Sequence, residues 1–303
     1  QYESPDKLSP AEVGMLIDNR SGMTEVTATL IDLAVRGYLR IEQTEKKGLI
    51  GKAKYTFVKR KAATGLSPAE KTLFDAIFIG SAKSVDVSSL DRSKMAVAVS
   101  SFQRQVKQEL EKKGYYAKER MTVSNWIWLF GAAVLIASGI AAVTAGADLG
   151  NLIGQASVAF VGVLFFILSF YRSSMTAAGY VEWGEVAGFR RFLSMTEKER
   201  LVFTDAPKRN PKQFSALLPF AVALGVEKEW AKQFAGMNVE KSTASWYHGY
   251  HPLNTATIGS DLSSFSGAIN SNFAPVSSSS GSSGGSSGGF SGGGSGGGGG
   301  GSW

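Results

Sequence analysis

Two long apolar runs, close together near the middle of the chain, constrain its fold most strongly. The run from Trp126 to Ala145 carries no charge and is almost entirely apolar, and a second uncharged run extends from Leu152 to Tyr171. A transmembrane helix needs about 20 predominantly apolar residues, and a helix satisfies its own backbone hydrogen bonds in lipid. The sequence therefore predicts a transmembrane hairpin over 121–172, with spans at about 126–145 and 152–171. A buried helical hairpin is the alternative.

Basic residues flank both apolar runs, whereas the loop between them carries no cation and a single carboxylate, Asp148. The flanking cations are Lys107, Lys112, Lys113, Lys118, Arg120, Arg172, Arg190 and Arg191. Because short cytoplasmic flanks hold the excess of Lys and Arg, we expect a multi-pass protein of a bacterial plasma membrane with both ends of this chain in the cytoplasm. Neither span contains an ionisable residue, which argues against a transport pathway.

Residues before the apolar runs contain an internal repeat, in which Leu8–Glu12 (LSPAE) returns as Leu66–Glu70. Ser is suited to the helix N-cap, Pro to the first helical position, and the Glu three residues after Ser completes a capping box. In the first copy, helices precede two strands, predicted at 38–43 and 54–59. The pattern predicts two small winged-helix-like α+β cytoplasmic units, at 1–63 and 64–120.

Winged helices often bind DNA, so the charge of these units matters. The chain as a whole carries a net charge of +7, which suits an anionic partner. However, the helix predicted over 24–36, which would enter the major groove, holds Glu25 and Asp32 against a single Arg36. Its composition is poor for base contacts. The simplest interpretation of these cations is a solvated surface. Among partners we expect anionic lipid headgroups or other proteins, with nucleic acid as the weaker alternative.

Beyond the apolar runs, residues 173–237 are predicted to form a cytoplasmic helical region. Trp183, Val186, Phe189 and Leu193 follow helical spacing, and 196–199 matches another capping box. The remainder, 238–303, is rich in Gly and Ser and is predicted to be a disordered tail. The last residue, Trp303, suggests either a tag or a degenerate end.

Chemistry-bearing residues form no recognisable set. The chain has no Cys, and its only imidazoles are His248 and His251. Two imidazoles three residues apart do not complete a metal site without further Cys or His ligands. No carboxylate pair or nucleophile–base arrangement stands out. We therefore predict no catalytic, cofactor-binding or metal-binding residues, no cofactor and no enzymatic activity.

Several segments together resemble the bacterial membrane-protein family called domain of unknown function 2207 (DUF2207), in its C-terminal portion. The likeness rests on LSPAEVGMLIDNR (8–20), TATLIDLAVRGYLRIE (27–42), LEKKGYY (110–116), GFRRFL (188–193), LPFAVALGVEKEWAKQF (218–234) and the SGGGSGGGGGGSW ending. The resemblance implies a further N-terminal portion with a signal peptide, an extracytoplasmic β-rich domain and another membrane span. It supplies no catalytic residues.

The expected fold class is a mainly α membrane protein, with a transmembrane helical hairpin, two winged-helix-like units and a disordered Gly/Ser tail. The expected function is a non-enzymatic protein-interaction or assembly module, anchored in the bilayer at the cytoplasmic face of the membrane. A membrane-tethered nucleic-acid-binding regulator is the alternative function.

Overall fold

The computed structural model describes residues 7–44, 53–117, 123–144, 154, 156–164, 175–195 and 209–274. Within these residues the chain is an α+β protein with a mixed four-stranded sheet. Its elements are α1 (Pro10–Asp18), α2 (Met23–Val35), β1 (Leu39–Thr44), β2 (Lys54–Lys59), α3 (Pro68–Ile77), β3 (Ser84–Asp86), η2 (Val87–Ser89), α4 (Arg92–Lys112), α5 (Val123–Thr144), α7 (Ala177–Ser194), α9 (Pro211–Ala223), α10 (Glu227–Lys232), α11 (Glu240–Thr243), β4 (Tyr247–His248) and α12 (Ile258–Phe273).

Both copies of the repeated pentapeptide begin a helix in the predicted way. Ser9 is the N-cap of α1 and Ser67 the N-cap of α3, and each forms a capping box with the Glu three residues later. In α1 the Glu12 backbone N–H donates to Ser9 Oγ at 3.3 Å, while the Ser9 N–H donates to the Glu12 carboxylate at 2.7 Å. These reciprocal bonds satisfy donors that a helix start would otherwise leave unpaired. The helix starts at both copies are confirmed.

The sheet joins segments that are far apart in the sequence, in the order β3-β2-β1-β4. Strands β1 and β2 pair antiparallel from Leu39 opposite Lys59 to Thr44 opposite Lys54. Strand β3 pairs antiparallel with β2, and the short β4 adds parallel to β1. Because β3 comes from the predicted second unit and β4 from beyond residue 237, the strands do not form two separate wings. Buried apolar residues from α1 through α12 pack in one hydrophobic cluster.

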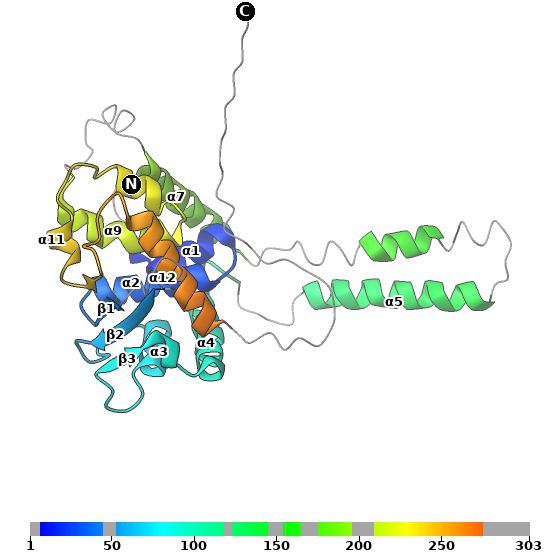
Figure 1. Cartoon of the computed structure of the whole chain (residues 1–303). Helices are drawn as coiled ribbons and strands as arrows, with labels where there is room; N and C mark the ends of the chain where they lie inside the picture. Colours follow the sequence, from blue (N-terminus) through cyan, green and yellow to red (C-terminus); the bar gives the residue numbers. More distant parts are fainter. Residues whose placement is uncertain are drawn as a thin grey trace, which may run out of the picture.

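Residues 239–274, which were predicted to belong to a disordered tail, form α11, β4 and α12. Helix α12 lies across the body of the protein (Figure 1) and buries five residues at helical spacing: Ile258, Leu262, Phe265, Ile269 and Phe273. The Phe265 ring packs edge-on against Tyr55 and Phe57 of β2, with centroid distances of 5.2 and 6.2 Å. The tail prediction is wrong for this stretch because five well-spaced apolar side chains bury enough surface to order an otherwise Ser-rich helix. Residues 275–303 lie outside the described residues.

The two apolar runs leave and rejoin the body at one point. Tyr116 and Met175, on either side of the two runs in the sequence, form an isolated antiparallel bridge, and α5 and the helical residues 156–164 lie side by side, away from the body (Figure 1). At their contact, a Cβ placed on Gly162 would lie 3.0 Å from Leu135 Cγ and 3.3 Å from Val134 Cγ1. We refer to this projection, residues 123–144 and 156–164, as the arm.

The predicted transmembrane hairpin requires correction. Taken over the residues described, none of the helices combines the length and apolar character that crossing a membrane requires. In α5, side chains are described only from Leu129 to Ile140, and the described helical residues of the second run are 154 and 156–164. The rest of the predicted spans lies outside these stretches. The multi-pass arrangement derived from the hairpin therefore has no support in the structure.

The predicted fold class is wrong in a second respect. Helices α1 and α2 followed by β1 and β2 match the expected order of a winged-helix unit, but α2 does not stand at a surface. It packs against α1, α9 and α12, and most of its residues are buried. The described chain is thus an α+β protein with a shared mixed sheet rather than a mainly α protein with two winged-helix-like units.

Candidate functional site

Neither of the two histidines belongs to a candidate metal site within the described residues. His248 is exposed, and its Nε2 lies 2.9 Å from the Ala244 carbonyl oxygen. His251 is also exposed, and its ring lies 4.8 Å, centroid to centroid, from the ring of Tyr250. Across the described part of the chain, no three or more His, Cys, Asp and Glu side chains gather in a way that could hold a metal ion.

Two buried carboxylates tie the repeated helix starts to other parts of the fold. Glu12, which is 4 % exposed, accepts a salt bridge from Lys113 Nζ at 3.0 Å, just beyond the end of α4. Glu70 of α3 pairs with Arg36 at 2.8 Å, just beyond the end of α2. Each capping Glu therefore accepts a backbone hydrogen bond at the start of its own helix and also pairs with a cation at the C-terminal end of a second helix. These carboxylates have a structural role.

Asp32 also pairs with Arg36, with 3.0 Å between the Asp32 carboxylate and Arg36 Nε. The carboxylates of Asp32 and Glu70 therefore share one guanidinium. Burial raises the pKa of Asp32 to about 6, against the attraction of Arg36 and with a smaller contribution from Glu70. Perturbed carboxylates often mark functional sites. Here, however, the group lies in an ion-pair network within the fold rather than in the groove described next.

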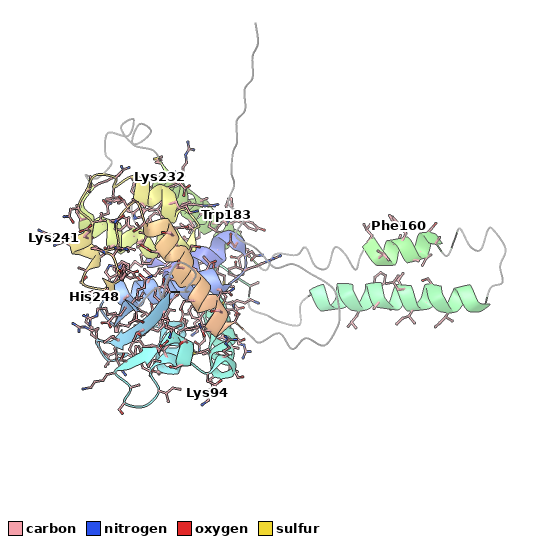
Figure 2. All side chains as sticks on the ribbon, in the orientation of Figure 1. Lys94, Phe160, Trp183, Lys232, Lys241 and His248 are labelled. Atoms are coloured by element: carbon pink, nitrogen blue, oxygen red, sulfur yellow. The ribbon has the colours of Figure 1, made fainter. Side chains whose placement is uncertain are left out.

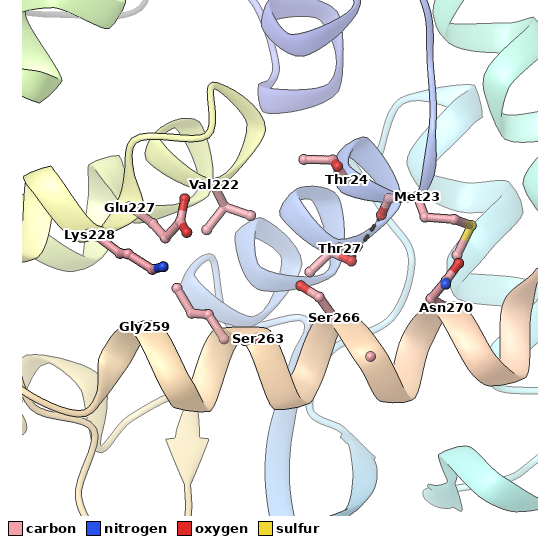
Figure 3. Close-up of a pocket in the computed structure, with 12 residues that line it drawn as sticks. Met23, Thr24, Thr27, Val222, Glu227, Lys228, Gly259, Ser263, Ser266 and Asn270 are labelled. Carbon is pink, nitrogen blue, oxygen red and sulfur yellow. Dashed lines mark hydrogen bonds between the residues drawn. The ribbon is translucent and has the colours of Figure 1, made fainter. Parts of the chain in front are cut away.

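The described residues enclose an open groove of about 540 Å³ between α2, α10 and α12 (Figure 3). Helix α12 forms one wall, and the first turns of α2 form the opposite one. Hydroxyl groups line both walls, Asn270 adds an amide on α12, and Val222 of α9 adds apolar surface. The lining residues are Met23, Thr24, Thr27, Val222, Glu227, Lys228, Gly259, Leu262, Ser263, Ser266, Gly267 and Asn270.

Two residues of opposite charge, Glu227 and Lys228, line the α10 end of this groove. Glu227 is 9 % exposed, and its burial raises the pKa of its carboxyl above the ordinary value, while Lys228 and its own backbone amide oppose that change. The Lys228 stem lies along Gly259, where a Cβ would be 3.4 Å from both Cγ and Cε. Gly259 thus lets the lysine stem lie against α12. The groove offers one buried acceptor and one cation for a ligand.

The wall formed by α12 is long enough for a polypeptide. Its lining residues extend from Gly259 to Asn270, which is about 16 Å at 1.5 Å per helical residue. About five residues of extended chain cover that length. Polar groups at Ser263, Ser266 and Asn270 recur at each turn, as hydrogen-bonding partners for a peptide backbone would.

The lining contains no evident nucleophile–base pair. The Thr27 hydroxyl donates to the Met23 carbonyl at 2.9 Å, and none of the contacts described for the groove joins a lining hydroxyl to an imidazole or a carboxylate. The set can therefore bind polar groups, but it offers no activated nucleophile of the kind that covalent catalysis needs.

Sequence reasoning missed this groove entirely. Its walls come from segments near residues 25, 225 and 265, and α12 was assigned to the disordered tail. The apolar spacing of Ile258, Leu262, Phe265, Ile269 and Phe273 was a readable helical pattern. The surrounding Ser and Gly residues, which are typical of a disordered tail, masked this helical pattern.

No contact among the described residues specifically supports nucleic-acid binding, the alternative function. Most of helix α2 is covered by α1, α9 and α12, and its first turns line the groove, so the helix does not present the open face that a DNA-reading helix needs. Among the basic residues at and beyond the end of the strand predicted at 54–59, Lys59 Nζ lies 5.2 Å from the Phe74 ring centroid, and Lys61 donates to the Arg36 carbonyl at 3.0 Å. Lys46, Lys47 and Lys52 lie outside the described residues.

Fold and groove together define an α+β protein with an internal ion-pair network and a peptide-length groove of mixed polar and apolar lining. The chain belongs to the family described as "Predicted membrane protein (DUF2207) C-terminal domain", which matches residues 1–234. This confirms the resemblance drawn from the sequence and supports a membrane location. No curated protein and no solved structure was found to match the chain. Helices α2 and α10 lie within the matched residues, whereas α12 lies beyond them.

Proposed function

We propose that this chain is a non-enzymatic interaction module at the inner face of a bacterial membrane, and that it binds an extended segment of another protein in the groove between α2, α10 and α12. The observation that carries the proposal is the groove itself, whose α12 wall matches about five extended residues. The net charge of +7 favours the inner leaflet, whose surface is anionic.

The chemistry of the lining indicates what the segment contributes. Backbone N–H and C=O groups of an extended peptide find acceptors and donors in the Ser263, Ser266 and Asn270 side chains. A Lys or Arg side chain, or another N–H donor, fits beside Glu227, because a buried carboxylate is stabilised by a positive or hydrogen-bonding partner. Val222 and Leu262 supply apolar surface for one side chain of the segment.

Photo-crosslinking from the groove tests this proposal in the full chain and its native membranes. Because the chain has no Cys, Ser263→Cys places a benzophenone maleimide at one known position. Ser264→Cys is a matched control, since Ser264 is an exposed neighbour on the same helix that does not line the groove. We expect one defined polypeptide adduct from Ser263→Cys and none from Ser264→Cys.

A second variant shows whether the adduct depends on the groove. Ser266→Trp fills it, so in the Ser263→Cys chain this substitution should abolish the adduct while leaving the circular dichroism spectrum unchanged. Equal adducts from both Cys positions, or an adduct that survives Ser266→Trp, would contradict the proposal.

A further inference from the structure

Most of the exposed large apolar side chains of the described residues lie in two places, the arm and α7, and the others are Ile79, Val97, Met237 and Tyr250. On the arm they are Leu129, Phe130, Ile136, Ile140, Val158, Phe160, Val161, Val163 and Leu164. On α7 they are Tyr180, Val181 and Trp183, which are 57 %, 68 % and 43 % exposed. Figure 2 shows Phe160 on the arm and Trp183 at the surface of the body. Such concentrated exposure indicates contact with something apolar.

In the sequence, Trp183, Val186, Phe189 and Leu193 follow helical spacing. The structure buries Val186, Phe189 and Leu193, whereas Trp183 faces outward. The Phe189 ring packs on Phe220 at 5.7 Å, centroid to centroid. One face of α7 is therefore firmly in the core, and the opposite face is uncovered within the described residues.

The uncovered face begins at the base of the arm. Thr176, the N-cap of α7, donates through its Oγ1 to the Gly114 carbonyl at 2.6 Å, and its backbone N–H donates to the Tyr115 carbonyl at 2.9 Å. Gly179 packs closely against the Tyr115 carbonyl. Met175 bridges to Tyr116, where the arm departs. The position of α7 relative to the arm's base is thus fixed by several contacts.

The composition of the uncovered face suits the headgroup region of a bilayer. Tyr and Trp favour that depth because their rings are apolar with one polar end. Gly184 and Gly188 leave open space beside Val181, so the helix backbone can approach a surface closely. Arg190 and Arg191 are exposed near the C-terminal end, against one exposed carboxylate on this helix, Glu185.

We infer that the exposed face of α7, carrying Tyr180, Val181, Trp183, Gly184 and Gly188, lies in the headgroup region of an anionic bilayer. Membership of a predicted membrane-protein family supplies the bilayer, and the start of α7 contacts residues 114–116, which precede the apolar arm in the sequence. The two arginines add an attraction of the kind that basic residues have for anionic lipid. The inference concerns a different surface from the peptide groove and does not depend on it.

Site-specific labelling of the full chain tests this surface. Val181→Cys is the only thiol in its variant and carries an environment-sensitive fluorophore. Val97→Cys is the control, because Val97 on α4 is 67 % exposed, against 68 % for Val181. It lies about 22 Å along α4 from Lys112, near the arm's base. Both proteins are reconstituted in vesicles of phosphatidylcholine with phosphatidylglycerol.

We expect the label at residue 181 to shift to shorter emission wavelengths and to be quenched by lipids with a nitroxide near the headgroup, whereas the label at 97 shows neither change. Replacing Arg190 and Arg191 by Glu should reduce the quenching at 181 in the mixed vesicles. A label at 181 that reports water, as at 97, would overturn the inference. A blue shift that persists in detergent without lipid quenching would also overturn it, since a protein would then cover the face. The crosslinking from Ser263 is unaffected by either result.

Discussion

Replacing Phe265 by Ala should strongly destabilise the protein, although this residue lies beyond the family-matched part of the chain. Phe265 is 3 % exposed, and its ring meets Tyr55 and Phe57 edge-on at 5.2 and 6.2 Å. Removal of a core Phe costs about 3–5 kcal/mol, including the cavity left behind. Because each aromatic pair adds about 0.5–1.5 kcal/mol beyond area burial, we place this substitution in the upper half of that range.

Chemical denaturation of the full chain in detergent, followed by circular dichroism and tryptophan fluorescence, measures the loss. Ser264→Ala is the matched control, because Ser264 is an exposed neighbour on α12 and such changes stay within about 0.5 kcal/mol. Phe265→Leu keeps most of the apolar volume and should lose less than the Ala variant, which keeps the test informative if Phe265→Ala does not fold. A loss below about 1 kcal/mol for Phe265→Ala would refute the packing of α12 on the sheet.

Four further substitutions have defined outcomes in the same unfolding assay. Gly14→Ala should destabilise the protein by about 1–3 kcal/mol, because the new Cβ would lie 2.7 Å from a Glu25 carboxylate oxygen and 3.3 Å from the Ala223 carbonyl oxygen. Gly267 has open space around it, so Gly267→Ala should instead stabilise the protein by about 0.5–1 kcal/mol. Equal effects of the two substitutions would contradict this reasoning. Ser67→Ala removes the N-cap of α3 and should cost about 1 kcal/mol; an unchanged midpoint would show that the capping box contributes nothing. Asp32 has a pKa of about 6 in the folded protein, against an ordinary value of 3.8, so the native state binds the Asp32 proton more tightly than the unfolded state does. The contribution of Asp32 to the free energy of unfolding therefore falls as pH rises from about 4 to 6, by about 3 kcal/mol in total. Asp32→Asn should flatten that part of the stability–pH curve, and an unchanged slope would show that Asp32 titrates normally.

Local elements were largely predictable because short-range interactions determine them. The capping boxes at Ser9 and Ser67 place the starts of α1 and α3 through bonds within one helical turn. The strand predicted over 54–59 is β2, and that over 38–43 is β1 shifted by one residue. Gly37 and Gly225 adopt positive φ angles of 78° and 65°, just after α2 and α9, as expected for glycine following a helix.

The partnerships between elements were not predictable in the same way. The pairing of β4 with β1 and the packing of Phe265 on Tyr55 join residues about two hundred positions apart, and no local pattern encodes such a contact. The pattern of α2 was apolar on one face, yet the structure encloses most of the helix because α9 and α12 cover what a winged-helix unit would expose.

By itself, the sequence determined the family, the helix starts, the strands of the central hairpin and the concentration of apolar residues in two runs. Only the tertiary structure decided that α12 is part of the core, that a groove forms between α2, α10 and α12, and that Trp183 faces outward beside the arm. The physical reason is that caps, turns and periodicity depend on neighbours in the chain. Burial depends on which distant surfaces meet, and that is decided only when the whole chain packs.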